Sequence, residues 1–114
     1  MKISLCIASR GHPVELQRVI EETDKRIADP SNVVISVALD DDDESNLPPP
    51  VTRAKLIWDI GPREDSLGAK YNRAAMNAPA DVYVLGADDN IFITEAWDDA
   101  VRDTMRFFPD ELGF

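Results

Sequence analysis

The sequence has a single cysteine, Cys6, so it contains no pair of thiols for an internal disulfide. Cys6 lies in the apolar run Ile3–Ala8, and we expect it to be buried as a small hydrophobic residue rather than to act as a nucleophile. The sequence also lacks an apolar run of the roughly 18 residues that a membrane-spanning helix needs. No signal-peptide pattern precedes the first apolar run, which favours a cytoplasmic protein without a membrane span.

Positive charge is scarce, with 12 Lys and Arg against 22 Asp and Glu and a formal net charge of -10. Nucleic acids and anionic membranes bind clustered cations, so the composition disfavours both as partners. A nucleotide ligand stays compatible, because a divalent cation and a few local basic residues can offset its charge. The 114 residues, 44% hydrophobic and 30% charged, predict one globular domain spanning 1–114.

Short apolar runs alternate with segments of helical periodicity along the chain. Strands are predicted at 3–8, 33–39, 55–60 and 82–85. Helices are predicted from Pro13 to about residue 29, from an N-cap at Ser66 to about residue 77, and after an N-cap at Thr94. Strands that are apolar on both faces and alternate with helices predict a three-layer α/β/α fold with a mostly parallel sheet.

Each predicted helix carries an apolar face that we expect to pack on the sheet, and we expect Trp58 to pack in the core. The residues of these faces are Leu16, Val19, Ile20 and Ile27, then Leu67, Tyr71, Ala74, Ala75 and Ala78, then Trp97, Val101, Met105 and Phe108. The sequence ends on apolar residues without a stop signal. We therefore expect a fold that is incomplete at this end, or an oligomer that covers the apolar surface.

Polar clusters follow three of the four predicted strands. The first strand is followed by Ser9, Arg10, Gly11 and His12, the second by 40–44, and the fourth by Asp88, Asp89 and Asn90. Ligands of open parallel sheets bind outside the carboxyl ends of the strands. The sequence therefore predicts one ligand site at this edge. For His12 we favour a capping or solvent-exposed role over ligand contact.

The acidic run at 40–44 is predicted to begin a loop. Unit charges about 4 Å apart repel by roughly 4 kcal/mol at an effective dielectric constant near 20, so most of the run should face solvent. Asp40 directly follows the apolar strand and is expected to point into the crevice. Its carboxylate there could accept a hydrogen bond from a nucleobase N–H or a ribose hydroxyl. The run lacks the spaced acids, the central glycine and the final glutamate of an EF-hand.

Asp88 and Asp89 are candidate metal ligands. Mg²⁺ and Mn²⁺ prefer oxygen ligands and often take one or two carboxylates together with substrate phosphates. The alternative is a strand-to-helix turn in which these side chains cap the local backbone. Lys70 and Arg73, on the helix that Ser66 opens, are candidate pyrophosphate contacts or ordinary solvated charges.

Together these segments resemble the nucleotide-sugar-binding half of a glycosyltransferase with the GT-A fold, and they are most similar to the family 2 type. The matching stretches are SLCIASRGHP at 4–13, VALDDDD at 37–43, SLGAKYNRAAMNAPADVYVLGADDN at 66–90 and FITEAWDDAV at 92–101. The resemblance covers nearly the whole chain but only the first part of such an enzyme. It implies a Rossmann-like, GT-A sheet.

The resemblance also implies roles for residues at the first two strand ends. Ala8, Ser9 and Arg10 would run along the nucleotide. Asp40 would lie by the base, and Asp42 near the ribose or the base. The implied donor is a nucleoside diphosphate sugar, with a UDP-sugar as the first choice and the acceptor unidentified.

At the later segments, the resemblance implies that Lys70 or Asn72 lies beside the nucleotide. Asp89, with Asp88, would bind Mn²⁺ or Mg²⁺ in a DxD-like motif, and Asp88 would also contact the nucleotide. The chain departs from the pattern at Ala87, where the first acid of the motif is expected. It also offers no candidate for the carboxylate base of inverting members, so no catalytic residue is assigned.

Three alternatives stay open. A non-catalytic nucleotide-binding or interaction module with a degraded site is favoured by Ala87 and by the missing base. A nucleotidyltransferase has similar architecture and metal-binding acids, but it typically begins with a glycine-rich, basic phosphate loop, and IASRGHP contains one glycine. A response-regulator receiver carries acids after its first strand, where this chain has Ser-Arg-Gly.

Overall fold

The sheet of this protein is parallel throughout. The computed structural model describes residues 1–89 and 94–106. In this part four strands pair in the order β3-β2-β1-β4, namely β1 (Ile3–Ala8), β2 (Val33–Asp40), β3 (Lys55–Gly61) and β4 (Val82–Gly86). Every pairing is parallel, and Ile3 lies in register with Val33 on one side and Val82 on the other. The predicted parallel sheet is confirmed.

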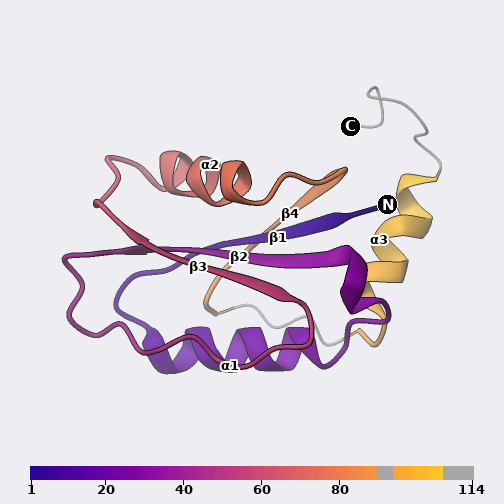
Figure 1. Ribbon diagram of the computed structural model, residues 1–114, viewed down its shortest axis with the longest axis horizontal. Coiled ribbons are helices and arrows are strands. Elements are labelled where there is room, and N and C mark those ends of the chain that lie inside the picture. The colour runs from indigo at the N-terminus through magenta and orange to yellow at the C-terminus, as the bar shows by residue number, and fades with distance from the viewer. Residues whose placement is uncertain (90–93, 107–114) are drawn as a thin grey trace.

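Helices cover both faces of the sheet (Figure 1). Helix α1 (Pro13–Asp24) lies on one face and α2 (Leu67–Asn77) on the other. Helix α3 (Trp97–Met105) lies beside the edge where the strands begin, where the Arg102 side chain reaches the carbonyl of Met1. The predicted three-layer α/β/α, Rossmann-like fold is confirmed. Loops form the opposite edge, where the strands end.

Two hydrophobic clusters hold the layers together. Strands β1 and β2 are buried along their whole length, because α1 and α2 cover both of their faces. The larger cluster lies on the α1 side and includes Leu16, Ile20, Ile35 and Trp97, with Trp58 partly buried against it. The smaller one lies on the α2 side and consists of Cys6, Ala38 and Ala74, with Tyr71 and Ala75 partly buried. The predicted burial of Cys6 is confirmed, as is the packing of both tryptophans in the core.

Helix α1 ends at Asp24, five residues before the predicted end near residue 29. The backbone tightens there, since the N–H of Arg26 bonds to the carbonyl of Thr23 and that of Ile27 to the carbonyl of Asp24. The Asp24 carboxylate accepts hydrogen bonds from the backbone N–H groups of Arg53 and Ala54. This contact with a distant segment fixes the turn, which a local pattern does not encode.

Helix α3 begins after Ala96, so the predicted N-cap at Thr94 is wrong. Ala96 has φ 55 and gives no side-chain cap, and its N–H donates to the carbonyl of Arg26 over 2.8 Å. This contact with the end of α1 decides where the helix starts. Phe108, predicted on its apolar face, lies outside the described residues. Leu67 is 63% exposed rather than packed, because it occupies the first position of α2, beyond the residues that cover the sheet.

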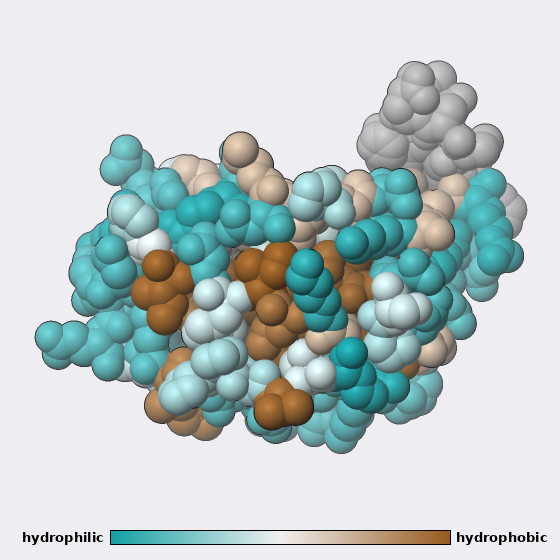
Figure 2. Space-filling model, in the orientation of Figure 1, coloured by the Kyte–Doolittle hydropathy of each residue, from teal (hydrophilic) through white to brown (hydrophobic). Residues whose placement is uncertain are grey.

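The two outer strands expose hydrophobic side chains. Figure 2 shows a band of hydrophobic residues over β3 between hydrophilic rims, and Ile60 of this strand is 47% exposed. On β4, Tyr83 is 46% and Leu85 is 63% exposed. Among the residues the structure describes, no helix is both long and apolar enough to cross a bilayer.

Candidate functional site

The ends of β1, β2 and β4 meet at one edge of the sheet. Ser9 follows β1, and its hydroxyl donates to Asp88 Oδ2 over 2.8 Å, beyond the end of β4. On its other side, the Ser9 N–H bonds to the carbonyl of Ala38 in β2. Ala8 is buried and paired with Ala38, so it contributes only backbone to this edge. Residues 79 positions apart in the sequence are thus joined at Ser9 and Asp88.

Asp40 is the most buried acid at this edge, with 2% of its surface exposed. Its Oδ2 accepts hydrogen bonds from Arg10 Nη1 at 2.9 Å and from Lys70 Nζ at 3.1 Å. Burial alone would raise the pKa of Asp40, but the hydrogen bonds from Arg10 and Lys70 outweigh it and hold the pKa below its usual value. The carboxylate is therefore ionised at neutral pH.

The second carboxylate oxygen of Asp40, Oδ1, differs from Oδ2. Oδ1 is buried and has no hydrogen-bond partner among the described residues. A buried acceptor without a donor costs free energy, commonly about 1–3 kcal/mol and more for a charged group. Asp40 can therefore accept one further hydrogen bond without giving up Arg10 or Lys70.

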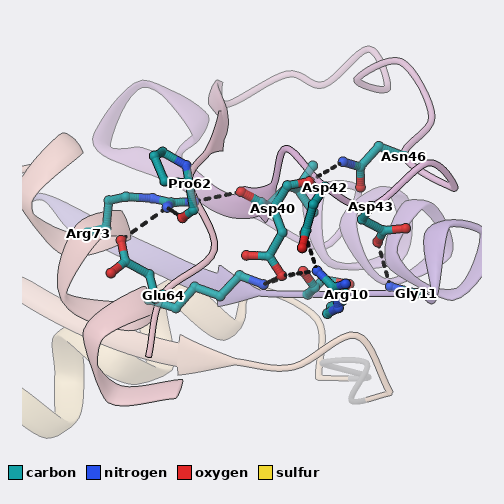
Figure 3. Close-up of polar contacts among 12 residues, drawn as sticks. Arg10, Gly11, Asp40, Asp42, Asp43, Asn46, Pro62, Glu64 and Arg73 are labelled. Atoms are coloured by element: carbon teal, nitrogen blue, oxygen red, sulfur yellow. Dashed lines mark hydrogen bonds and ion pairs between the residues drawn. The ribbon is translucent and has the colours of Figure 1, made fainter. Parts of the chain in front are cut away.

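The acidic loop after β2 is fastened to the turn after β1. Arg10 Nη1 also donates to Asp42 Oδ1 over 2.6 Å, and the Gly11 N–H donates to Asp43 Oδ2 over 2.8 Å (Figure 3). Hydrogen bonds from Ser45 and then from Gly11 lower the pKa of Asp43 to about 2. Part of the acidic run thus orders the loop instead of only facing solvent.

The role of Asp43 was not anticipated from the sequence. Its Oδ1 accepts both the N–H of Ser45 at 3.0 Å and the Ser45 hydroxyl at 2.6 Å. An Asp followed two residues later by Ser is the local signal of such a turn, in which an Asp side chain binds backbone two positions on. The partner Gly11 has φ 73, which glycine adopts without strain.

Lys70 lies inside the site rather than on the helix surface. Its side chain is 8% exposed, and its ammonium bonds to the Ser9 carbonyl at 2.7 Å as well as to Asp40. Lys70 thus joins the end of β1 to the end of β2 through these two hydrogen bonds. Asn72, the other candidate on α2, is exposed and forms no hydrogen bond within residues 1–89 and 94–106.

Arg73 is also fully engaged with the protein. Figure 3 shows its guanidinium between the carbonyl of Pro62 and the carboxylate of Glu64. A further Nη donates to the carbonyl of Leu39 over 2.6 Å, and Nε lies 3.0 Å from Asp59 Oδ2. Arg73 therefore joins α2 to the ends of β2 and β3.

A hollow of about 240 Å³ lies between α1 and the end of β4. Its lining consists of Glu15, Arg18, Val19, Asp88 and Asp89. The two candidate metal ligands are thus on the wall of one concave space, with Asp88 anchored by Ser9 and Asp89 exposed. Asn90 of the same predicted cluster lies outside the described residues.

Tyr71 links α2 to the end of β4, another contact that the sequence did not indicate. Its hydroxyl donates to the carbonyl of Gly86 over 2.6 Å. Burial raises the pKa of Tyr71, and the nearby charges of Asp88 and Asp89 raise it further. The phenol stays protonated and remains a donor beside the two carboxylates.

Asp88 and Asp89 offer two of the oxygen ligands that a hard divalent cation requires. Within the described ranges, no three His, Cys, Asp or Glu side chains are arranged to hold a metal ion. Two carboxylates are nevertheless a set that Mg²⁺ or Mn²⁺ accepts when phosphate oxygens and water complete the coordination. The residues present fit a cation that arrives with a phosphate ligand.

His12 occupies the N-cap position of α1 but makes no side-chain capping bond. Its side chain is 62% exposed, and Nδ1 lies 3.9 Å from a Glu15 carboxylate oxygen. Of the two expected roles, exposure to solvent is correct and capping is wrong.

Comparison of the chain with protein-family models, curated proteins and solved structures gave no match.

Proposed function

We propose that this chain is the donor-binding part of a glycosyltransferase that uses a nucleoside diphosphate sugar and a divalent cation. The observation that carries the proposal is Asp40, a buried, ionised carboxylate with one unpartnered oxygen at the carboxyl edge of a parallel sheet. A nucleobase N–H is a donor of the required kind. The likeness of the strand-end segments to family 2 glycosyltransferases supports the same assignment.

Different residues of the chain would bind the base and the diphosphate of the ligand. Arg10 and Lys70 hold the Asp40 carboxylate through Oδ2, and Oδ1 would accept a hydrogen bond from the base. Asp88 and Asp89 would hold Mn²⁺ or Mg²⁺, which offsets the negative charge that develops on the diphosphate leaving group when it is bound. Ser9 keeps Asp88 oriented through its hydroxyl. No described residue is assigned as the base that activates the acceptor.

A non-catalytic nucleotide-binding module is the second candidate. Ala87 in place of an acid favours it, since only two carboxylates then follow β4. Release of UDP from UDP-sugars in the presence of Mn²⁺ tests whether the chain itself carries out transfer. Catalytic release rules out the non-catalytic module, and nucleotide binding without release favours it.

Calorimetric titration with UDP and with GDP, with and without Mn²⁺, tests the proposal. We expect one nucleotide to bind in a Mn²⁺-dependent manner and Asp89→Asn to abolish that dependence. Asp103→Asn is the matched control, because Asp103 is exposed on α3 at the opposite edge. If the folded protein binds neither nucleotide, the proposal fails. If Asp89→Asn binds like the native chain, only the metal assignment fails.

A further inference from the structure

Arg18 is the cation in the wall of the hollow between α1 and β4. The other charged residues that line this space are the acids Glu15, Asp88 and Asp89. Arg18 is exposed and forms no hydrogen bond or ion pair with another residue in the described part of the chain. Its guanidinium is therefore available to an incoming anion.

The other cations close to this edge are occupied. Lys70 is buried against Asp40 and the Ser9 carbonyl. Arg73 is bound by Asp59, Glu64 and two backbone carbonyls. A ligand phosphate that recruited either of them would break contacts that order the strand ends, whereas binding to Arg18 breaks none.

Arg10 is occupied as well, since one of its nitrogens bonds to both Asp40 and Asp42. These hydrogen bonds raise the pKa of Arg10 further above its already high value. If Arg10 turned to a phosphate, the Asp40 carboxylate would lose one of its two hydrogen-bond donors. Binding of the phosphate by Arg18 breaks no such hydrogen bond.

The first turn of α1 reaches the hollow through Glu15, three residues before Arg18. Helix α1 has 12 residues and starts at Pro13, and no side chain caps its first N–H groups. Free N–H groups at a helix start carry partial positive charge, and the effect is confined to the first turn. Glu15 and Arg18 lie three positions apart, so both face the same hollow.

The acids in the wall decide which anion can enter. Three carboxylates repel a bare phosphate, so the ligand must bring or meet a divalent cation that Asp88 and Asp89 can share. A diphosphate held by such a cation has some oxygens bound to the cation and others free to accept hydrogen bonds. Arg18 then meets the oxygens that the cation leaves free, in the bidentate geometry that a guanidinium favours.

We propose that Arg18 is the phosphate-binding residue of this site, in place of Lys70 and Arg73. The proposal rests on the proposed function, because it assumes that the ligand is a nucleoside diphosphate. Ser9 connects the Asp40 site to the wall of the hollow, because its carbonyl accepts a hydrogen bond from Lys70 and its hydroxyl donates one to Asp88. The proposal places the base of one ligand at Asp40 and its phosphates at Arg18.

The test compares UDP with uridine on three proteins by calorimetry in Mn²⁺. These are the native chain, Arg18→Gln and the control Arg106→Gln, whose side chain is 77% exposed on α3. Loss of one charge-assisted contact should weaken UDP binding by roughly tenfold or more in Arg18→Gln. Uridine affinity should not change, and Arg106→Gln should match the native chain for both ligands.

Each outcome decides a different claim. If UDP binds the native chain and Arg18→Gln equally, the Arg18 inference is overturned and the proposed function stands. An equal loss for uridine and UDP also overturns it, because Arg18 would then act on the base or on the fold. If the native chain binds neither UDP nor GDP, the proposed function fails, and pyrophosphate with Mg²⁺ becomes the probe. Pyrophosphate binding that depends on Arg18 would then support an anion site at Arg18 without a nucleotide. If pyrophosphate does not bind, the anion site at Arg18 is overturned as well.

Discussion

Asp98 shows how one buried acid can stabilise a junction far from the binding edge. It has no exposed surface. Its oxygens accept the N–H groups of Ala28 at 2.7 Å and Asp29 at 3.0 Å, together with Arg102 Nη1 at 2.7 Å. Removing a buried acid strands the donors that it satisfied, so the cost exceeds that of an exposed pair.

We expect Asp98→Ala to lower the free energy of unfolding by about 3–5 kcal/mol, because Arg102 would lose its buried partner and the N–H groups of Ala28 and Asp29 would lose their acceptor. Urea denaturation followed by circular dichroism measures the change. Asp99→Ala is the matched control, since Asp99 is 57% exposed and should cost about 1 kcal/mol or less. Equal effects of the two substitutions would contradict this account of Asp98.

Asp98 and Lys70 also mark what the sequence could not reveal about single residues. Asp40 was predicted to point into the crevice because it directly follows an apolar strand, and it does lie buried at that edge. Lys70 was expected to be either a pyrophosphate contact or an ordinary solvated charge on a helix. Its burial depends on Asp40, 30 positions away, and no local pattern encodes such a pairing.

Helix α2 starts where its sequence indicates. Ser66 has extended backbone and its hydroxyl accepts the N–H of Ala69 over 3.1 Å, which satisfies one of the free donors of the first turn. The prediction succeeded because a Ser cap is a local signal. The end of α1 and the start of α3 were predicted wrongly, because contacts of Asp24 and Ala96 with other segments fix them.

We expect Ser66→Ala to lower the free energy of unfolding by about 1 kcal/mol, the usual cost of losing a cap. Ser66→Asp, which keeps an acceptor and adds negative charge at a helix start, should retain the stability of the native chain. Urea denaturation of both variants checks this. A Ser66→Asp protein as unstable as Ser66→Ala would show that the hydroxyl does not act as a cap.

Two buried, ionised carboxylates make the stability of the whole molecule depend on pH. Burial works to raise the pKa values of Asp40 and Asp98, yet hydrogen bonds from Arg10 and Lys70, and from Ala28, Asp29 and Arg102, hold both below the usual value. The folded state thus binds fewer protons than the unfolded state, whose Asp groups titrate near about 3.9.

Stability should therefore be constant from about pH 7 to pH 5 and fall as the pH drops below about 4, through the folded-state pKa values. Urea midpoints measured across this range test the sign. Asp98→Asn should reduce the size of the fall, because the amide carries no titrating proton. A midpoint that rises on acidification would contradict the charges assigned to Asp40 and Asp98.

At the scale of the whole fold, the sequence was sufficient to predict the parallel sheet and its covering helices. The continuous apolar run at 33–39 was expected to be buried on both faces, and β2 is buried along its whole length. The meeting of polar residues at one edge of the sheet followed from their positions after three strands. The contacts among them did not, since Ser9 and Asp88, or Gly11 and Asp43, meet only once the chain has folded.

We propose that a nucleotide binds where β1, β2 and β4 end. Backbone amide chemical shifts, recorded while UDP or GDP is added to the labelled chain in Mg²⁺, test it most directly. The account predicts saturable shifts at Ser9, Gly11, Asp40 and Asp88, with α3 at the other edge unchanged. Shifts confined to other surfaces, or none with either nucleotide, would contradict it.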